Sequence, residues 1–174
     1  MKNKMRPLTE GEKAMLKPCF GMRIDYEGVR LCHGHRYHPI PIVALKMPNT
    51  DAVTIEKTIY FDNRYVEDFS ADGIDRESPA LLFHEMTHVY QWALLGRVGF
   101  LARYAKEFLS VRMKSAAMYD YERAAGEPPL HFNEARLEAQ AAMIQDYARF
   151  HLARDAAGMQ SKAVHLARTH FFGL

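Results

Sequence analysis

Two histidines and a glutamate share one short stretch of the chain, which reads HEMTH over residues 84–88. On an α-helix, positions four apart lie on one face with Cβ atoms about 5–6 Å apart, so the imidazoles of His84 and His88 can reach one ion. Zinc suits them because it accepts histidine nitrogen at about 2.0–2.1 Å. Glu85 projects about 100° away from His84, where a carboxylate can take a proton from water instead of binding the metal. The motif therefore predicts a zinc-dependent hydrolytic site with Glu85 as general base.

A catalytic zinc site takes three protein ligands, and the stretch NEARLEAQAAMIQDY offers two candidates for the third, Glu134 and Glu138. They are four residues apart and share a helical face, so spacing alone does not separate them. Glu134 falls in the first turn of the predicted helix, where the macrodipole favours a carboxylate without any metal. Glu138 is expected deeper in the helix among small and apolar neighbours, where a carboxylate needs something positive opposite it.

Two helices must position these residues. Ser78 as N-cap with Pro79 at the first helical position predicts a helix to about residue 95, ended by Gly96. Asn133 as N-cap predicts a second helix from Glu134 to about residue 157, rich in alanine.

The rest of the chain predicts shorter elements. A capping-box spacing from Thr9 to Glu12 indicates a helix over residues 9–19, ended before Gly21. Residues 29–61, including the IPIVAL and AVTIEKTIYF runs, read as a small irregular β region. Further helices are expected over 99–112 and 161–170, with a glycine- and proline-containing loop between residues 119 and 132. We expect a single domain over residues 1–174, of the α+β class and dominated by helix.

Composition narrows the class of protein. The 23 basic and 21 acidic side chains give a net charge of +2, which demands neither nucleic acid nor an anionic membrane as partner, although local patches stay open. Two cysteines, Cys19 and Cys32, are too few for a disulfide scaffold and read as reduced thiols. Neither a signal peptide nor a membrane span is evident. We expect a cytoplasmic protein, whose export would need a route independent of a signal peptide.

Two other clusters leave alternatives open. Cys32, His33, His35 and His38 would suit a second metal site, but an exposed strand face explains the alternating histidines as well. The basic residues of the 97–114 region could line a groove for an acidic polymer or form a solvated helix face: Arg97, Arg103, Lys106, Arg112 and Lys114.

The stretch HEMTHVYQW, joined to the later EAQAAMIQDY, resembles the Vgr-related protein family. The segments RPLTEGEKAMLKPCFG, IDYEGVRL and IYFDNRYVEDFS also match that family's pattern. Its members occur near type VI secretion spike genes in bacteria and are similar in motif to zincins with a glutamate third ligand. The resemblance implies a zincin-like fold, His84, His88 and Glu138 as zinc ligands, Glu85 as base, and a secretion-spike protein as partner.

Many such zincins carry an aspartate four residues after the ligand glutamate, where this chain has Ala142. Asp146 lies eight residues after Glu138 and about 80° round the helix, so it is the substitute we expect to orient a histidine. Tyr119 and Tyr121 are candidate donors to an oxyanion, with Tyr121 taken as catalytic and packing as the alternative role.

These features predict a zinc metallopeptidase that hydrolyses amide bonds of a peptide, a protein or peptidoglycan. One alternative is a non-catalytic adaptor that keeps the fold within a secretion spike or phage-like tail. Another is a toxin domain delivered to a rival cell, which shares the chemistry and differs in target.

Overall fold

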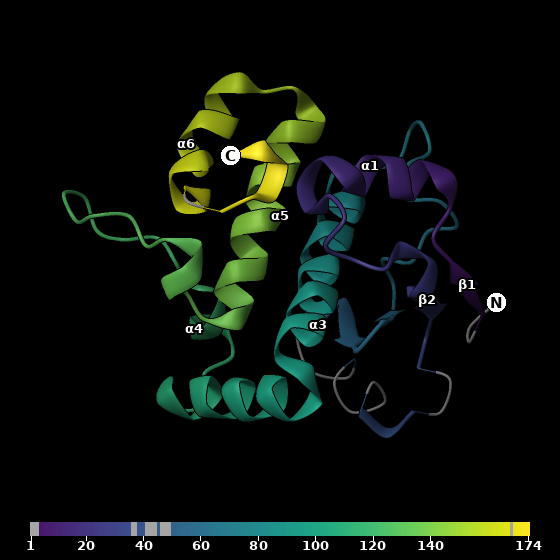
Figure 1. Cartoon of the computed structure of the whole chain (residues 1–174), viewed down its shortest axis with the longest axis horizontal. Helices are drawn as coiled ribbons and strands as arrows, with labels where there is room; N and C mark the ends of the chain where they lie inside the picture. The colour runs from purple at the N-terminus through teal and green to yellow at the C-terminus, as the bar shows by residue number, and fades with distance from the viewer. Residues whose placement is uncertain (1–3, 36–37, 41–44, 46–49, 168) are drawn as a thin grey trace.

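The motif residues lie on the longest helix, α3 (Glu77–Ser110), in a computed structural model that describes residues 4–35, 38–40, 45, 50–167 and 169–174. Gly96 divides this helix, with φ 67° and ψ 171°, a conformation that glycine adopts without steric cost. Figure 1 shows the second segment of α3 running across the foot of the first. The expectation that Gly96 ends one helix and that another follows it is confirmed.

The helix α3 starts two residues before the expected first position, Pro79. The helix begins at Glu77, and Asp75 satisfies its first turn: one carboxylate oxygen accepts from the backbone N–H groups of Glu77 and Ser78, both at 3.0 Å. The other oxygen accepts from the Ser78 hydroxyl at 2.8 Å. Ser78 is therefore inside the helix and is not its cap, because an aspartate three residues earlier reaches the same orphan donors.

Helix α1 (Glu10–Phe20) begins with the expected capping box between Thr9 and Glu12 and ends at Gly21. Glu12 is fully buried, because its carboxylate also accepts both Nη groups of Arg6 at 2.7 and 2.8 Å and the backbone N–H of Phe69 at 2.9 Å. One glutamate thus joins the helix terminus to the first strand and to the loop before α3.

Four short strands form a mixed sheet in the order β1-β2-β4-β3. β2 (Arg30–His33) and β4 (Thr58–Phe61) are parallel, whereas β1 (Met5–Pro7) and β3 (Ala52–Ile55) pair antiparallel at the two edges. The expected β region is present, and β1 is an addition to it. Residues 41–44 of the IPIVAL run lie outside the described residues.

The C-terminal half is helical, with boundaries that differ from those expected. A short α4 (Ala116–Tyr119) precedes the loop, and α5 (Leu137–Ala153) starts three residues later than predicted. Asn133 does not cap it, since the preceding residues form a 3₁₀ turn over Phe132–Glu134. Arg154 adopts a left-handed conformation that ends α5, and α6 (Ala156–Leu166) begins five residues before the predicted helix.

The core lies where the first segment of α3 meets the sheet, α1 and α5, and Leu82, Phe83 and Met86 are fully buried there. Cys19 and Cys32 are buried thiols that are not joined to each other. No helix within the described parts of the chain is long and apolar enough to cross a bilayer. The architecture is α+β, mainly helical with a small sheet in the N-terminal half, and the expected fold class is confirmed.

Candidate metal centre

Three ligand atoms from α3 and α5 meet in the interior. Nε2 of His88 lies 3.1 Å from Oε2 of Glu138 and 3.2 Å from Nε2 of His84, and the His84 nitrogen lies 3.3 Å from the same carboxylate oxygen. The three residues are between 4 and 7% exposed. Among the residues that the structure describes, no other three side chains drawn from His, Cys, Asp and Glu are close enough to share an ion.

The separation of these atoms tests whether zinc fits. Two ligands about 2.05 Å from a tetrahedral ion lie about 3.3 Å apart, and the three observed separations are within about 0.2 Å of that value. The donor set of two imidazoles and a carboxylate is also one that catalytic zinc uses. The residues present therefore fit a zinc ion.

Gln91 decides which nitrogen of His88 faces the centre. Its amide NH₂ donates to the backbone oxygen of Leu137 at 3.0 Å and to Oε1 of Gln140 at 2.9 Å, so its own oxygen faces Nδ1 of His88 at 2.7 Å. We assign the ring proton to Nδ1 on this basis. Neutral His88 then points the Nε2 lone pair at the centre, as a metal ligand must.

The charges at the centre call for a cation. Burial lowers the pKa of His88. The charge and hydrogen bond of Glu138 outweigh burial, and the pKa rises to about 9. Burial alone would raise the pKa of Glu138. The charges and hydrogen bonds of the two histidines outweigh it and hold the pKa of Glu138 well below its usual range. Lone pairs this close together repel one another unless a proton or a metal ion lies between them.

Glu85 lies next to the centre and is held by the edge of the sheet. The carboxylate is 4% exposed, and its Oε2 accepts from the Thr54 hydroxyl at 2.7 Å. Thr54 is itself held by the indole N–H of Trp92, which donates to its backbone oxygen at 3.2 Å. No hydrogen bond within the described residues involves Oε1 of Glu85, which can therefore accept a proton.

Two tyrosines surround Glu138. The Tyr119 ring stacks on His84 with centroids 5.9 Å apart. Burial raises the pKa of Tyr119, and that of Tyr104 in the second segment of α3, and the charge and hydrogen bond of Glu138 raise both further. Both phenols thus stay protonated at neutral pH and can act as donors.

Glu138 was expected deep in its helix, but it lies at the start of α5. Because α5 starts at Leu137, Glu138 lies in the first turn, and Glu134 lies outside the helix in the exposed 3₁₀ turn. The macrodipole argument therefore applies to Glu138. The structure nevertheless brings Glu138, and not Glu134, to the two histidines.

Asp146 and Tyr121 lie together at a different place. The Tyr121 hydroxyl donates to Asp146, which also accepts from Arg149, and the Tyr121 ring packs edge-on against His165. None of the hydrogen bonds and ion pairs within the described residues joins Asp146 to His84 or His88. Eight residues of helix place Asp146 about 12 Å along the axis from Glu138, which is too far to orient either ring. Gln91 takes the expected role at His88, while Nδ1 of His84 is buried with no partner among the described residues.

The N-terminal histidine cluster does not assemble. Among the residues that the structure describes, Cys32, His33, His35 and His38 form no group that could hold an ion. His33 ends β2 and stacks on Tyr65, with ring centroids 4.7 Å apart.

Sequence reasoning did not identify Gln91, Thr54 or Tyr104 as parts of the site. Gln91 had a signal, since it follows His88 by three residues on the same helical face. Thr54 and Tyr104 had none, because each reaches the site only through the packing of another element.

No protein-family model and no curated protein matches the chain. Among solved structures, it is similar to the effector domain of Pseudomonas aeruginosa VgrG2b. The TM-score is 0.59 at 28% identity, and the match covers 90% of this chain and 79% of that domain. This similarity supports the expected link to Vgr-related proteins.

Proposed function

We propose that the chain is a zinc-dependent metallohydrolase, a zincin-like peptidase that acts as an effector linked to type VI secretion. One observation carries the hydrolase part: a buried triangle of ligand atoms from His84, His88 and Glu138 lies next to the carboxylate of Glu85. A zinc ion held there supplies a Lewis acid that polarises a carbonyl and makes water a better nucleophile at neutral pH.

Glu85 supplies the acid–base chemistry in this proposal. With Oε2 held by Thr54, the carboxylate keeps a fixed orientation and can accept a proton from water on Oε1, then return it to the leaving amine. A structural zinc site is closed by four protein ligands and needs no base. The three ligands and the adjacent carboxylate therefore favour an enzyme over a non-catalytic adaptor.

Tyr119 is the better placed oxyanion donor. Its ring stacks on His84 and its hydroxyl lies by Glu138 at the centre, whereas the Tyr121 hydroxyl donates to Asp146, away from the centre. We propose that the Tyr119 hydroxyl stabilises the carbonyl oxygen as negative charge develops on it.

The secretion part rests on the similarity to the VgrG2b effector domain. It supports association with a secretion spike protein. Export without a signal peptide is part of the proposal. We propose that the substrate is an amide bond of a peptide, a protein or peptidoglycan. The shape of the pocket decides among these three.

The purified full chain should bind close to one zinc ion, and His88→Ala should abolish binding in elemental analysis after zinc is supplied. Glu85→Gln should keep the zinc but lose on the order of 10²-fold or more in turnover, measured on a proteome digest and a peptidoglycan digest. Glu134→Gln, an exposed glutamate outside the site, is the matched control and should leave both unchanged. A chain that takes up no transition metal would refute the metallohydrolase, and equal digests by active wild type and Glu85→Gln would refute the role of Glu85.

A further inference from the structure

The second segment of α3 presents an apolar face to solvent. Val98 is 81% exposed, Leu101 48% and Leu109 67%, and Met113, just beyond the end of the helix, is 60% exposed. Val98, Leu101 and Leu109 lie within about 80° of one another around the helix axis. They therefore share one outward face of the helix, and we call these three residues and Met113 the outer stripe.

The core does not account for the outer stripe. Phe100 is buried against Trp92, and Arg103 points inward to Glu107 and to the backbone oxygen of Ala135. These inward residues lie roughly opposite Val98 and Leu109 around the axis. A surface helix ordinarily carries polar side chains on its outward face. Here the outward face carries exposed apolar side chains, which indicates a partner for it.

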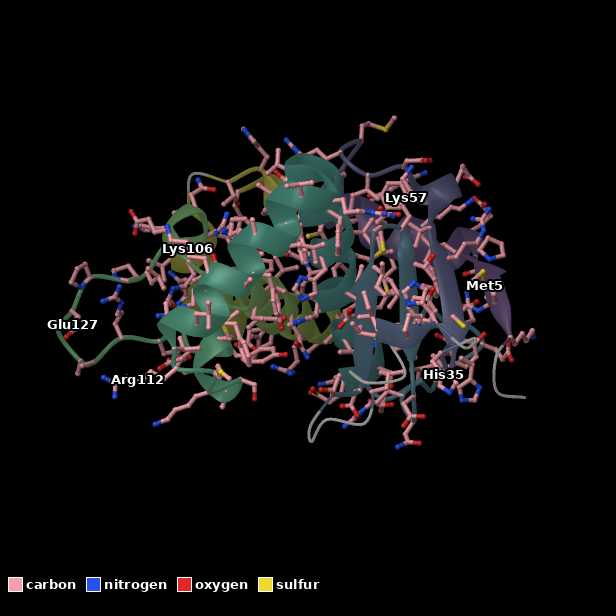
Figure 2. The ribbon with its side chains drawn as sticks, turned by 90° about the horizontal axis from the view of Figure 1, so that it is seen from below. Met5, His35, Lys57, Lys106, Arg112 and Glu127 are labelled. Carbon is pink, nitrogen blue, oxygen red and sulfur yellow. The ribbon has the colours of Figure 1, made fainter. Side chains whose placement is uncertain are left out.

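Unpaired cations border the outer stripe. Residues 97–114 contain five basic side chains and one acidic, although the whole chain carries only +2. Arg97 pairs with Glu56 and Arg103 with Glu107. Within the described residues, no carboxylate forms an ion pair with Lys106, Arg112 or Lys114. Figure 2 looks onto this segment from below and shows Lys106 and Arg112 far from Met5 in β1 and from His35 and Lys57, which lie just outside the strands.

The turn after the helix brings charge and apolar surface together. Arg112 and Met113 have φ values of 52° and 59°, a left-handed conformation that is uncommon for side chains of this size. Two such residues in succession turn the chain sharply and leave both side chains exposed at the end of the helix. An exposed methionine beside exposed cations suits insertion between lipid headgroups.

We propose that the outer stripe binds the surface of an anionic phospholipid bilayer. An amphipathic helix with an apolar face and flanking Lys and Arg residues lies in the plane of such an interface, where its apolar side chains enter the headgroup region and its cations meet lipid phosphates. A nucleic acid would be met by the cations but would leave the apolar side chains between them without a partner. The proposal is independent of hydrolysis.

The inward face of the same segment relates the surface to the candidate metal centre. The Phe100 ring packs edge-on against His88, with centroids 6.2 Å apart, and Tyr104 lies beside Glu138. A chain bound through its outer stripe would therefore hold the centre one helix diameter, about 10 Å, from the headgroups.

Vesicle flotation tests the proposal with the full chain. It should float with vesicles of phosphatidylglycerol and phosphatidylcholine and stay behind with pure phosphatidylcholine, and binding should weaken in 0.5 M salt by about tenfold or more because exposed charges are screened. Changing Lys106, Arg112 and Lys114 together to Gln should lower partitioning on the order of 100-fold, about fivefold for each charge.

The apolar contribution is tested separately. Leu101→Gln with Leu109→Gln should lower partitioning at least tenfold, whereas Met22→Gln with Val164→Gln, which changes two exposed apolar residues on other elements, should not. Leu109→Trp is a check that avoids polar substitutions. The tryptophan fluorescence of this variant should shift to the blue when anionic vesicles are added, while buried Trp92 contributes a constant background.

Three results would overturn the proposal: no flotation with anionic vesicles, equal flotation with neutral ones, or equal partitioning of the Leu101 and Leu109 double variant. Sedimentation equilibrium adds a fourth. A dimer that the double variant abolishes, in a chain that does not bind vesicles, would assign the outer stripe to a second copy.

Discussion

Oε1 of Gln91 accepts a hydrogen bond from Nδ1 of His88, and the two atoms are 2.7 Å apart. Zinc sites often place a carboxylate where this chain has the neutral amide. The same side chain donates to the backbone of Leu137, the residue before Glu138. Gln91 therefore orients one ligand and ties its helix to the first turn of the helix that carries another.

Gln91→Ala should weaken zinc binding by about 10–100-fold, because the His88 ring loses its orienting acceptor. Gln91→Glu keeps an acceptor for Nδ1 but loses the two donors that bond the Leu137 backbone oxygen and Oε1 of Gln140, so it should retain more zinc affinity than Gln91→Ala while destabilising the fold. Competitive titration against a chelator measures both. Equal affinity in Gln91→Ala and wild type would show that packing alone orients the ring.

The two glutamates near the start of α5 should differ in their effect on zinc affinity. Glu138→Ala removes the carboxylate that lies within 3.3 Å of both histidine nitrogens, so affinity should fall by 10²-fold or more. Glu134→Ala changes an exposed side chain outside the helix and should alter it less than twofold. The reverse pattern would mean that the third ligand lies one helical turn away.

Tyr119 and Tyr121 should separate activity from stability. Tyr119→Phe should lower kcat by about 10²-fold with zinc content unchanged, because it removes the proposed oxyanion donor. Tyr121→Phe should leave kcat unchanged but destabilise the fold by about 1 kcal/mol, because Asp146 loses a donor. Steady-state kinetics and urea unfolding measure the two effects. Loss of kcat in Tyr121→Phe alone would support the role first expected for Tyr121.

Glu12 should be among the residues most important for stability. Glu12→Gln leaves Arg6, whose side chain is 11% exposed, without its buried counter-charge, so the free energy of unfolding should fall by about 3–5 kcal/mol. Glu10→Gln on the same turn changes a side chain that is 88% exposed and should leave the free energy of unfolding nearly unchanged. Urea unfolding of all three chains at one zinc concentration makes the comparison. A similar loss in both variants would rule out the ion pair as the cause.

Local signals in the sequence predicted the features that depend on neighbouring residues. Thr9 and Glu12 cap α1, Gly96 divides α3, and His84 and His88 share a face, because each relation spans four residues or fewer and follows from helix geometry. The boundaries of α5 and α6 were less well predicted, since Asn133 and Ser161 are weak signals beside the left-handed Arg154 that separates the two helices.

Tertiary structure decided the partners that come from distant parts of the chain. Glu138 meets His84 across 54 residues, and Thr54 reaches Glu85 across 31, so both contacts depend on how α5 and β3 pack against α3. Helix periodicity could place Asp146 only on an approximate face of its helix. It could not show that Asp146 bonds the Tyr121 hydroxyl away from the centre, or that Gln91 accepts the hydrogen bond of His88 instead. A hydrogen bond needs its two atoms within about 3.2 Å, and spacing along one helix determines nothing at that precision about another helix.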